Sequence, residues 1–330
     1  MVEKANIDIE ARLGGDKAAV AAALNLLETR RPESLEQARA LLEVLSSKAK
    51  PRRHVIGITG PPGAGKSSLI SHIIPEYRSR NKSVGIISVD PSSRKSGGAL
   101  LGDRVRIAYD ATDPGVFIRS MAAGSHLGGL AWQTRHCLTV FEAVFDIILV
   151  ETVGVGQSET EIDQVVDTIV FVVQPGSGDV LQYLKAGIME IPHVLLINKG
   201  DQKNLAMRAY NDLKTAGTLN PTGESDWNLE IIMASALEGW GQEELVATME
   251  KHGDFLLENN IEAIRKHNRC QWVYVLFRER FGSWGIETLG GEASVFDLIS
   301  KTDITNPFRS MDALAEKLHD TSEGSRMTAP

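Results

Sequence analysis

Cysteine is almost absent from this chain of 330 residues, and the two present, Cys137 and Cys270, lie far apart in the sequence. Two distant cysteines provide neither a disulfide framework nor a CxxC metal site, so the sequence predicts a reducing compartment. No run of 18 apolar residues occurs, and residues 1–9 lack the apolar core of a secretion signal. We therefore expect a cytoplasmic protein without a membrane anchor.

Basic residues are also in the minority, because 35 Lys and Arg stand against 43 Asp and Glu, for a net charge of −8. Nonspecific binding to nucleic acid or to anionic lipid requires a basic face. We therefore expect neither nucleic acid nor a membrane as a partner. The composition, 42% hydrophobic and 24% charged, is that of a globular protein, and the length allows one large domain or two.

Residues 1–50 predict a helical prefix. The Ala- and Leu-rich segment 17–31 and the segment 35–48 each have the spacing of a helix, with Pro32 at the break between them. The stretch from Ser34 to Gln37 has the pattern of a capping box, which predicts Ser34 as the N-cap of the second helix. We expect this prefix to pack on another part of the chain.

Residues 51–258 alternate short β-branched runs with helical segments. Runs without polar alternation are typical of strands buried on both faces, so the pattern predicts an α/β fold with a mainly parallel sheet flanked by helices. Ligands of such sheets bind at the carboxyl ends of the strands. The predicted strands are 55–59, 83–89, 146–150, 168–173, 193–198 and 230–235.

Residues 259–330 predict a C-terminal helical arm. The β-branched runs stop before this segment, and seven aromatic side chains lie between residues 272 and 308. This density of aromatics indicates a surface that must be buried. Two alternatives remain open, because the arm can pack on its own domain or form a dimer interface.

The first predicted strand leads directly into the pattern G-x-x-x-x-G-K-S, followed by a helical segment. In a phosphate-binding loop the backbone N–H groups surround the phosphates, Lys66 bridges the terminal ones and the Ser67 hydroxyl ligates Mg²⁺. A chance glycine loop is the alternative, but the strand before it and the helix after it favour a nucleotide site. The predicted binding residues are Gly60, Pro61, Pro62, Gly63, Ala64, Gly65, Lys66, Ser67 and Ser68.

The fifth predicted strand ends in the sequence NKGD at residues 198–201. The carboxylate of Asp201 can accept hydrogen bonds from both N1–H and the N2 amine of guanine, whereas adenine would leave it partly unpaired. Asn198 and Lys199 would brace this loop and cover the base. A second loop over the base is predicted after the last strand, at Ser235, Ala236 and Leu237.

Acidic side chains follow two other strands and predict a Mg²⁺ site. Glu151 occupies the position of the Asp in the usual D-x-x-G motif, and the N–H of Gly154 would sense the γ-phosphate. Asp90 and Asp103 are candidates to hold the metal or to orient the attacking water. The alternative for Asp90 is a turn residue before Pro91.

The residue after Gly154 is Val155, where Ras-like enzymes have the glutamine that orients water. We therefore expect slow unaided GTP hydrolysis. Gln157 can contribute only if its loop folds back. The segments 90–104, 151–161 and 174–179 are the loops expected to differ between the GTP and GDP states.

The histidines suggest no metal site. His126, His136 and His193 are isolated in the sequence, and each is predicted to be a surface or core residue. The pair His136-Cys137 has no neighbouring third group, so we do not interpret Cys137 as a nucleophile.

Together these motifs resemble one family. The segments GPPGAGKSS, VDPSSRKSGGALLGDR, ILVETVGVGQSETE, QPGSGDVLQYLKAG and NKGD, in this order, are similar to the MeaB/ArgK group of P-loop GTPases of the SIMIBI class, which includes the methylmalonic aciduria type A protein. The resemblance extends over roughly residues 10–260.

The resemblance implies a GTP-dependent chaperone that gates cofactor loading of an adenosylcobalamin-dependent acyl-CoA mutase, such as methylmalonyl-CoA mutase, and protects or reactivates it. It implies GTP/GDP and Mg²⁺ as ligands, a homodimer formed through the C-terminal helices, and an adenosyltransferase as a possible further partner. Carried over by residue, Lys66 and Ser67 bind phosphate and Mg²⁺. Asp90, Asp103 and Glu151 surround the metal, and the loop 174–187 corresponds to the switch that contacts the mutase.

Three other functions of P-loop proteins remain as alternatives, and the sequence argues against each. A P-loop kinase of the transport-protein type would need a base site that accepts ATP, which NKGD argues against. A nickel or zinc metallochaperone GTPase would be expected to carry His- or Cys-rich motifs. A protein-targeting GTPase would need a Met-rich domain, and 8 Met in 330 residues do not provide one.

Overall fold

The computed structural model describes residues 16–28, 32–46, 48–49, 52–90, 106–122, 132–152, 162–176, 191–219 and 227–327. In this part of the chain no helix is long and apolar enough to cross a membrane.

The described residues form one parallel sheet of seven strands in the order β3-β2-β4-β1-β5-β6-β7. The apolar runs of the five inner strands are buried on both faces, as expected for a parallel sheet. The P-loop NTPase fold class predicted from the sequence is therefore confirmed. The strands are β1 His54–Thr59, β2 Val84–Asp90, β3 Val116–Ala122, β4 Ile147–Glu151, β5 Thr168–Val173, β6 Val194–Ile197 and β7 Glu230–Met233.

The strand β3 was not predicted from the sequence. Its run VFIRSMA contains Arg119 and Ser120, which interrupt the apolar pattern. Arg119 is accommodated because β3 is at the edge of the sheet, where its guanidinium pairs with Glu28 of the prefix. The strand thus depends on a partner distant in sequence.

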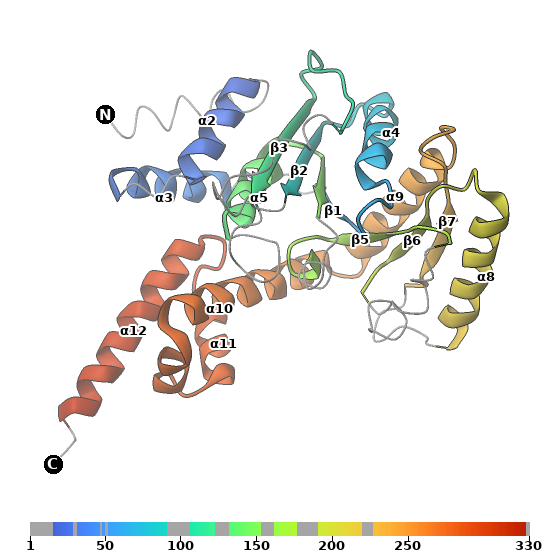
Figure 1. Cartoon of the computed structure of the whole chain (residues 1–330). Helices are drawn as coiled ribbons and strands as arrows, with labels where there is room; N and C mark the ends of the chain where they lie inside the picture. Colours follow the sequence, from blue (N-terminus) through green and yellow to red (C-terminus); the bar gives the residue numbers. More distant parts are fainter. Residues whose placement is uncertain are drawn as a thin grey trace.

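Helices cover both faces of the sheet (Figure 1). On one face lie α4 (Lys66–Ser79) and α9 (Gln242–Glu258), whose buried side chains share one apolar cluster with β1, β2 and β4–β7. On the other face lie α5 (Trp132–Val144) and α8 (Lys203–Leu219). A short 3-10 helix, η2 (Ile162–Gln164), precedes β5.

The prefix helices α2 (Lys17–Glu28) and α3 (Pro32–Ser46) pack against α5. Leucines of both helices, among them Leu24, Leu41 and Leu45, are fully buried in a cluster that extends to the sheet. The prefix therefore packs on the core, as predicted. The predicted N-cap at Ser34 is wrong, because α3 begins at Pro32, whose fixed φ and missing N–H suit the first turn of a helix.

The C-terminal arm consists of α10 (Ile261–Thr288), α11 (Glu292–Ser300) and α12 (Pro307–Met327). Gly282 interrupts α10 with φ 64° and ψ −164°, which a glycine adopts without strain. The three helices bury a cluster of their own that includes Phe277 and the stacked rings of Tyr274 and Phe296. Figure 1 shows the arm projecting from the sheet, with α12 beginning near α3.

Candidate functional site

The phosphate loop lies at the carboxyl end of β1, and its shape depends on glycine. Gly60, Gly63 and Gly65 all have positive φ, at 135°, 79° and 91°. A Cβ at Gly60 would lie 2.3 Å from the Val172 carbonyl oxygen, and one at Gly65 would lie 2.3 Å from Asn198 Nδ2. Glycine is therefore required at both positions, for the backbone angle and for space.

Lys66 opens α4 and is buried inside this loop. Its Nζ donates hydrogen bonds to the carbonyl oxygens of Gly60, at 2.7 Å, and Pro61, at 3.1 Å. Both contacts hold the ammonium group above the N-terminus of α4. The positive end of the helix dipole and the lysine charge thus both favour an anion at this position, as a phosphate site requires. Pro62 and Ser68 are exposed at the loop and in the first turn of α4.

Glu151 joins three elements at the end of β4. Its Oε1 accepts a hydrogen bond from Ser67 Oγ at 2.6 Å, and its Oε2 accepts one from Ser88 Oγ at 3.2 Å. Ser88 lies opposite Glu151 in the register of β2 and β4. The predicted proximity of Ser67 and Glu151 is thus present. Ser88 was missed, and its sequence signal is a single serine within an otherwise apolar strand.

The serine hydroxyl and carboxylate beside a phosphate loop fit a Mg²⁺ ion, which binds through few protein oxygens together with phosphates and waters. Among the described residues, no group of three or more His, Cys, Asp or Glu could hold a metal by itself. Asp103, Gly154 and Val155 lie outside the described residues. For Asp90 only the backbone is described, as the last residue of β2, so these predicted roles stay predictions.

Asn198 connects the phosphate loop to the predicted base loops. Its Nδ2 donates to the Ala64 carbonyl oxygen at 2.8 Å, and its Oδ1 accepts from the Ala236 N–H at 3.2 Å. The side chain is buried, so both bonds are sheltered from water. The NKGD segment therefore fixes the relative position of the two loops that would contact the two ends of a nucleotide.

The second base loop is held by Asp201. Its Oδ1 accepts from Ser235 Oγ at 2.7 Å, and Ser235 Oγ accepts from the Glu238 N–H at 3.1 Å. Lys199 has φ 58°, the left-handed conformation that turns the chain between Asn198 and Asp201. These residues, predicted from separate motifs, lie together at the carboxyl ends of β6 and β7, while Leu237 is 84% exposed at the loop tip.

The sequence matches the family described as methylmalonyl Co-A mutase-associated GTPase MeaB over residues 20–285. The chain belongs to this family. The match covers most of the two prefix helices, the sheet with its nucleotide loops and most of α10, so the family resemblance found in the motifs is confirmed. As a member, the chain is a P-loop GTPase that binds guanine nucleotides and hydrolyses GTP.

Named relatives agree with membership of the MeaB family. A Pyrococcus horikoshii protein named as a GTPase is 37% identical over 94% of this chain and 97% of its own length. The GTPase ArgK of Escherichia coli is 32% identical, covering 78% of this chain and 79% of the relative. The mitochondrial methylmalonic aciduria type A homolog of mouse is 33% identical over 80% of this chain and 67% of the relative.

A crystal structure of a LAO/AO transport system kinase has the same fold as this MeaB family member. The TM-score is 0.70 over 96% of this chain and 98% of the other, at 24% sequence identity. The identity is low, so the comparison shows a shared architecture and nothing about activity.

Two further predictions concern histidine and cysteine. Cys137 lies in α5 and is buried, and burial raises the pKa of its thiol, as expected for a structural residue. His193, isolated in the sequence, is partly buried in the structure, and the centre of its ring lies 4.2 Å from that of His252. His126 and the side chain of His136 lie outside the described residues.

Proposed function

We propose that this GTPase is a chaperone of an adenosylcobalamin-dependent acyl-CoA mutase, gating its cofactor loading and protecting or reactivating it. The support is the family itself, whose description names association with methylmalonyl-CoA mutase, and the mouse relative named for methylmalonic aciduria. The observation that carries the GTP-dependent part is the Asn198 bridge between the phosphate loop and the base loop.

In the proposed mechanism the chain holds GTP at both ends. Asp201 would read guanine, and Lys66 would exchange its two carbonyl partners for phosphate oxygens. Ser67 and Glu151 would hold Mg²⁺, with Ser88 fixing the carboxylate. When bound, Mg²⁺ neutralises charge on the β- and γ-phosphates. Asp90 and Asp103 are proposed to complete this acidic cluster and to orient water.

The proposal extends to partners. We propose a homodimer through residues 259–330, supported by apolar side chains of α10 that are exposed, with Trp284 at 57% and Ile264 and Val275 at 38%. A contact with an adenosyltransferase is proposed on the resemblance alone. The loop 174–187 is the proposed contact with the mutase. In its described part, Gln174 lies beside Gly63 of the phosphate loop.

The function is tested by phosphate release with and without methylmalonyl-CoA mutase. Val155 replaces the water-orienting glutamine, so we expect slow hydrolysis alone and a rise of several-fold or more when the mutase is added. Fast turnover that is indifferent to the mutase would contradict the proposal.

A nucleotide swap provides the control for this test. The Asp201→Asn variant is expected to prefer xanthosine triphosphate, so mutase-stimulated hydrolysis should move from GTP to that nucleotide. Stimulation that stays with GTP would contradict the role proposed for Asp201.

A further inference from the structure

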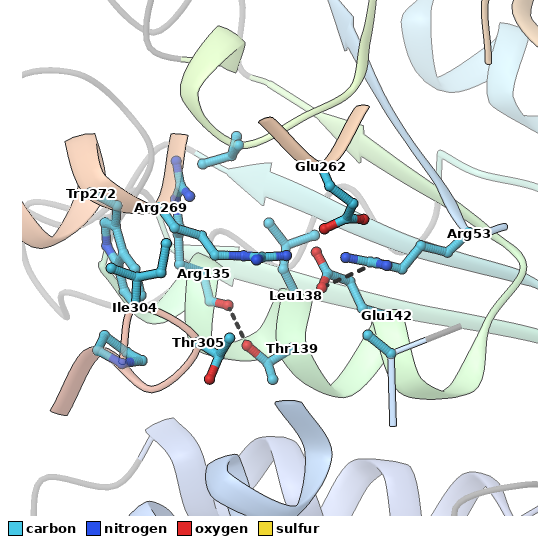
Figure 2. Close-up of a pocket in the computed structure, with 13 residues that line it drawn as sticks. Arg53, Arg135, Leu138, Thr139, Glu142, Glu262, Arg269, Trp272, Ile304 and Thr305 are labelled. Carbon is cyan, nitrogen blue, oxygen red and sulfur yellow. Dashed lines mark hydrogen bonds and ion pairs between the residues drawn. The ribbon is translucent and has the colours of Figure 1, made fainter. Parts of the chain in front are cut away.

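A pocket of about 320 Å³ lies between the GTPase core and the C-terminal arm, apart from the nucleotide loops. Four of its lining residues, at positions 135, 138, 139 and 142, share one face of α5. The opposite wall comes from α10 and from the loop that leads into α12. Figure 2 shows the lining side chains drawn around this space, among them Arg53, Arg135, Glu142, Arg269 and Trp272.

The acids of this pocket already have basic partners. Glu142 pairs with Arg53, at 3.2 Å between Oε2 and Nε, and Glu262 pairs with Arg265 Nη1 at 3.0 Å. Two donors of Arg135, Nε and Nη2, are shielded from solvent and have no hydrogen-bond partner in the described part of the chain. Buried donors of this kind are rare in native proteins, and one explanation is a bound ion.

The geometry of the two unpartnered donors indicates what they bind. Nε–H and Nη2–H lie on the same side of a guanidinium and form a fork that matches the two oxygens of a carboxylate. The same chain uses this fork elsewhere. Three arginines donate from Nε and Nη2 to the two oxygens of one carboxylate. The pairs are Arg265–Asp167, Arg78–Asp113 and Arg119–Glu28.

The surroundings of Arg135 favour an anion with an apolar body. The guanidinium carbon lies 5.5 Å from the centre of the Trp272 ring, and Leu138, Ile304 and Pro307 complete an apolar wall. Arg269 adds a further positive charge to the lining. The pKa of Arg135 is lowered to about 9, mainly by burial; Glu142 and Asp163 raise it and Arg269 lowers it, but burial outweighs them. A bound anion would stabilise the charged form.

We propose that this pocket binds a small carboxylic acid, with the carboxylate on the fork of Arg135 and the apolar part against Trp272. The site lies between α5 and the arm, so its occupancy would strengthen the joint between them.

Butyrate is a suitable probe, and butyramide is its neutral, nearly isosteric control. The full chain is first loaded with GDP, which keeps the phosphate loop filled. Butyrate is then titrated by calorimetry and by tryptophan fluorescence. We expect saturable binding of butyrate, a fluorescence change that is lost in Trp272→Phe, and at least tenfold weaker binding of butyramide.

Variants assign the binding to the fork. Arg135→Gln is expected to weaken butyrate binding at least tenfold, and so is Arg135→Lys, which keeps the charge but loses the fork. Arg208→Gln, at an exposed position of α8, is the control and should bind as the unmodified chain does.

Three results would overturn the proposal: absence of saturable butyrate binding, equal binding of butyrate and butyramide, or inorganic phosphate binding where butyrate does not. All three need only the unmodified chain, so the test holds even if Arg135 variants fail to fold.

Discussion

At the scale of single residues, Asn198 and Asp201 perform different tasks within one short motif. Asn198 forms hydrogen bonds with two loops, one through its amide nitrogen and one through its amide oxygen. Asp201 has one carboxylate oxygen bonded to Ser235. The first residue is therefore structural, and we propose that the second reads the base. Substitutions at the two positions should therefore have different consequences.

Asp201→Asn should weaken GTP binding at least tenfold and strengthen binding of xanthosine triphosphate. The asparagine amide provides an N–H donor where the aspartate has only acceptors. This donor can bond the carbonyl that xanthine carries in place of the N2 amine of guanine. Competition between the two nucleotides in a titration measures the change. Asp212→Asn, at an exposed position of α8, is the matched control, and unchanged GTP affinity in Asp201→Asn would remove the argument for base specificity.

Ser88→Ala should raise the Mg²⁺ concentration needed for half-maximal GTP hydrolysis by a few-fold. The substitution removes the 3.2 Å hydrogen bond to Oε2 and leaves Glu151 held only by Ser67 among the bonds described above. Such a bond contributes about 1 kcal/mol. A Mg²⁺ titration of the GTPase rate measures the effect.

Ser120→Ala provides the control for this substitution. Ser120 lies on the neighbouring strand β3, and its buried hydroxyl has no hydrogen-bond partner among the residues that the structure describes. An equal Mg²⁺ effect in both variants would show that Ser88 does not position Glu151.

At the scale of elements, one ion pair fastens the arm to the sheet. Arg265 of α10 donates from Nε and Nη2 to the two oxygens of Asp167, just before β5, at 2.9 and 2.8 Å. Burial alone would raise the pKa of Asp167. The Arg265 guanidinium has the larger effect in the opposite direction and holds this pKa below its usual range. Arg265 also donates to the Arg53 carbonyl oxygen at 2.8 Å.

Arg265→Met should destabilise the protein by about 3–5 kcal/mol, because it leaves the Asp167 carboxylate buried without its partner. Urea unfolding measures the loss, and the double variant Arg265→Met/Asp167→Asn should recover part of it. Arg309→Met is the control, since its pair with Glu43 is exposed and should contribute about 1 kcal/mol or less. Equal losses in the two single variants would contradict this reasoning.

Elements differ in how far the sequence predicts them. The phosphate loop and NKGD were predictable because their glycines, lysine and carboxylate act through local backbone geometry. The strand β3 could not be predicted, because its Arg119 is stabilised by Glu28, which is distant in the sequence. The role of Ser88 could not be predicted either, because it arises from the pairing of β2 with β4. The helix start at Pro32 was missed because a capping box and a first-turn proline are competing local signals.

At the scale of the whole molecule, three histidines from separate segments meet near the amino-terminal end of the sheet. Thr168 Oγ1 lies 2.6 Å from His54 Nε2 and 2.7 Å from His252 Nδ1. Its single hydroxyl proton can be donated to only one ring, so the other ring must donate to the oxygen. His193 Nδ1 accepts from the Ile169 N–H, which identifies that nitrogen as unprotonated.

This cluster should make the protein sensitive to acid. Burial lowers the pKa of His54 and His193 to about 4 and that of His252 to about 2. Between pH 6.5 and 4 the unfolded chain therefore binds protons that the folded chain does not. Stability should fall as pH falls through this range, by about 1.4 kcal/mol per pH unit for each histidine, and should be unaffected above it.

Urea unfolding at pH 7.5 and pH 5 measures this dependence. His252→Asn should lower stability at pH 7.5 but make the fall toward pH 5 shallower. His267→Asn, at an exposed position, should leave the slope unchanged. A slope that is the same in all three proteins would show that the cluster does not govern acid stability.

The prefix and the arm meet although they are at opposite ends of the chain. Arg39 of α3 pairs with Asp312 of α12 at 2.7 Å, and Arg309 pairs with Glu43. During synthesis α2 and α3 emerge before β3, α5 and α12, with which they make contacts. Their contacts are therefore complete only after α12 has been made and has docked on them.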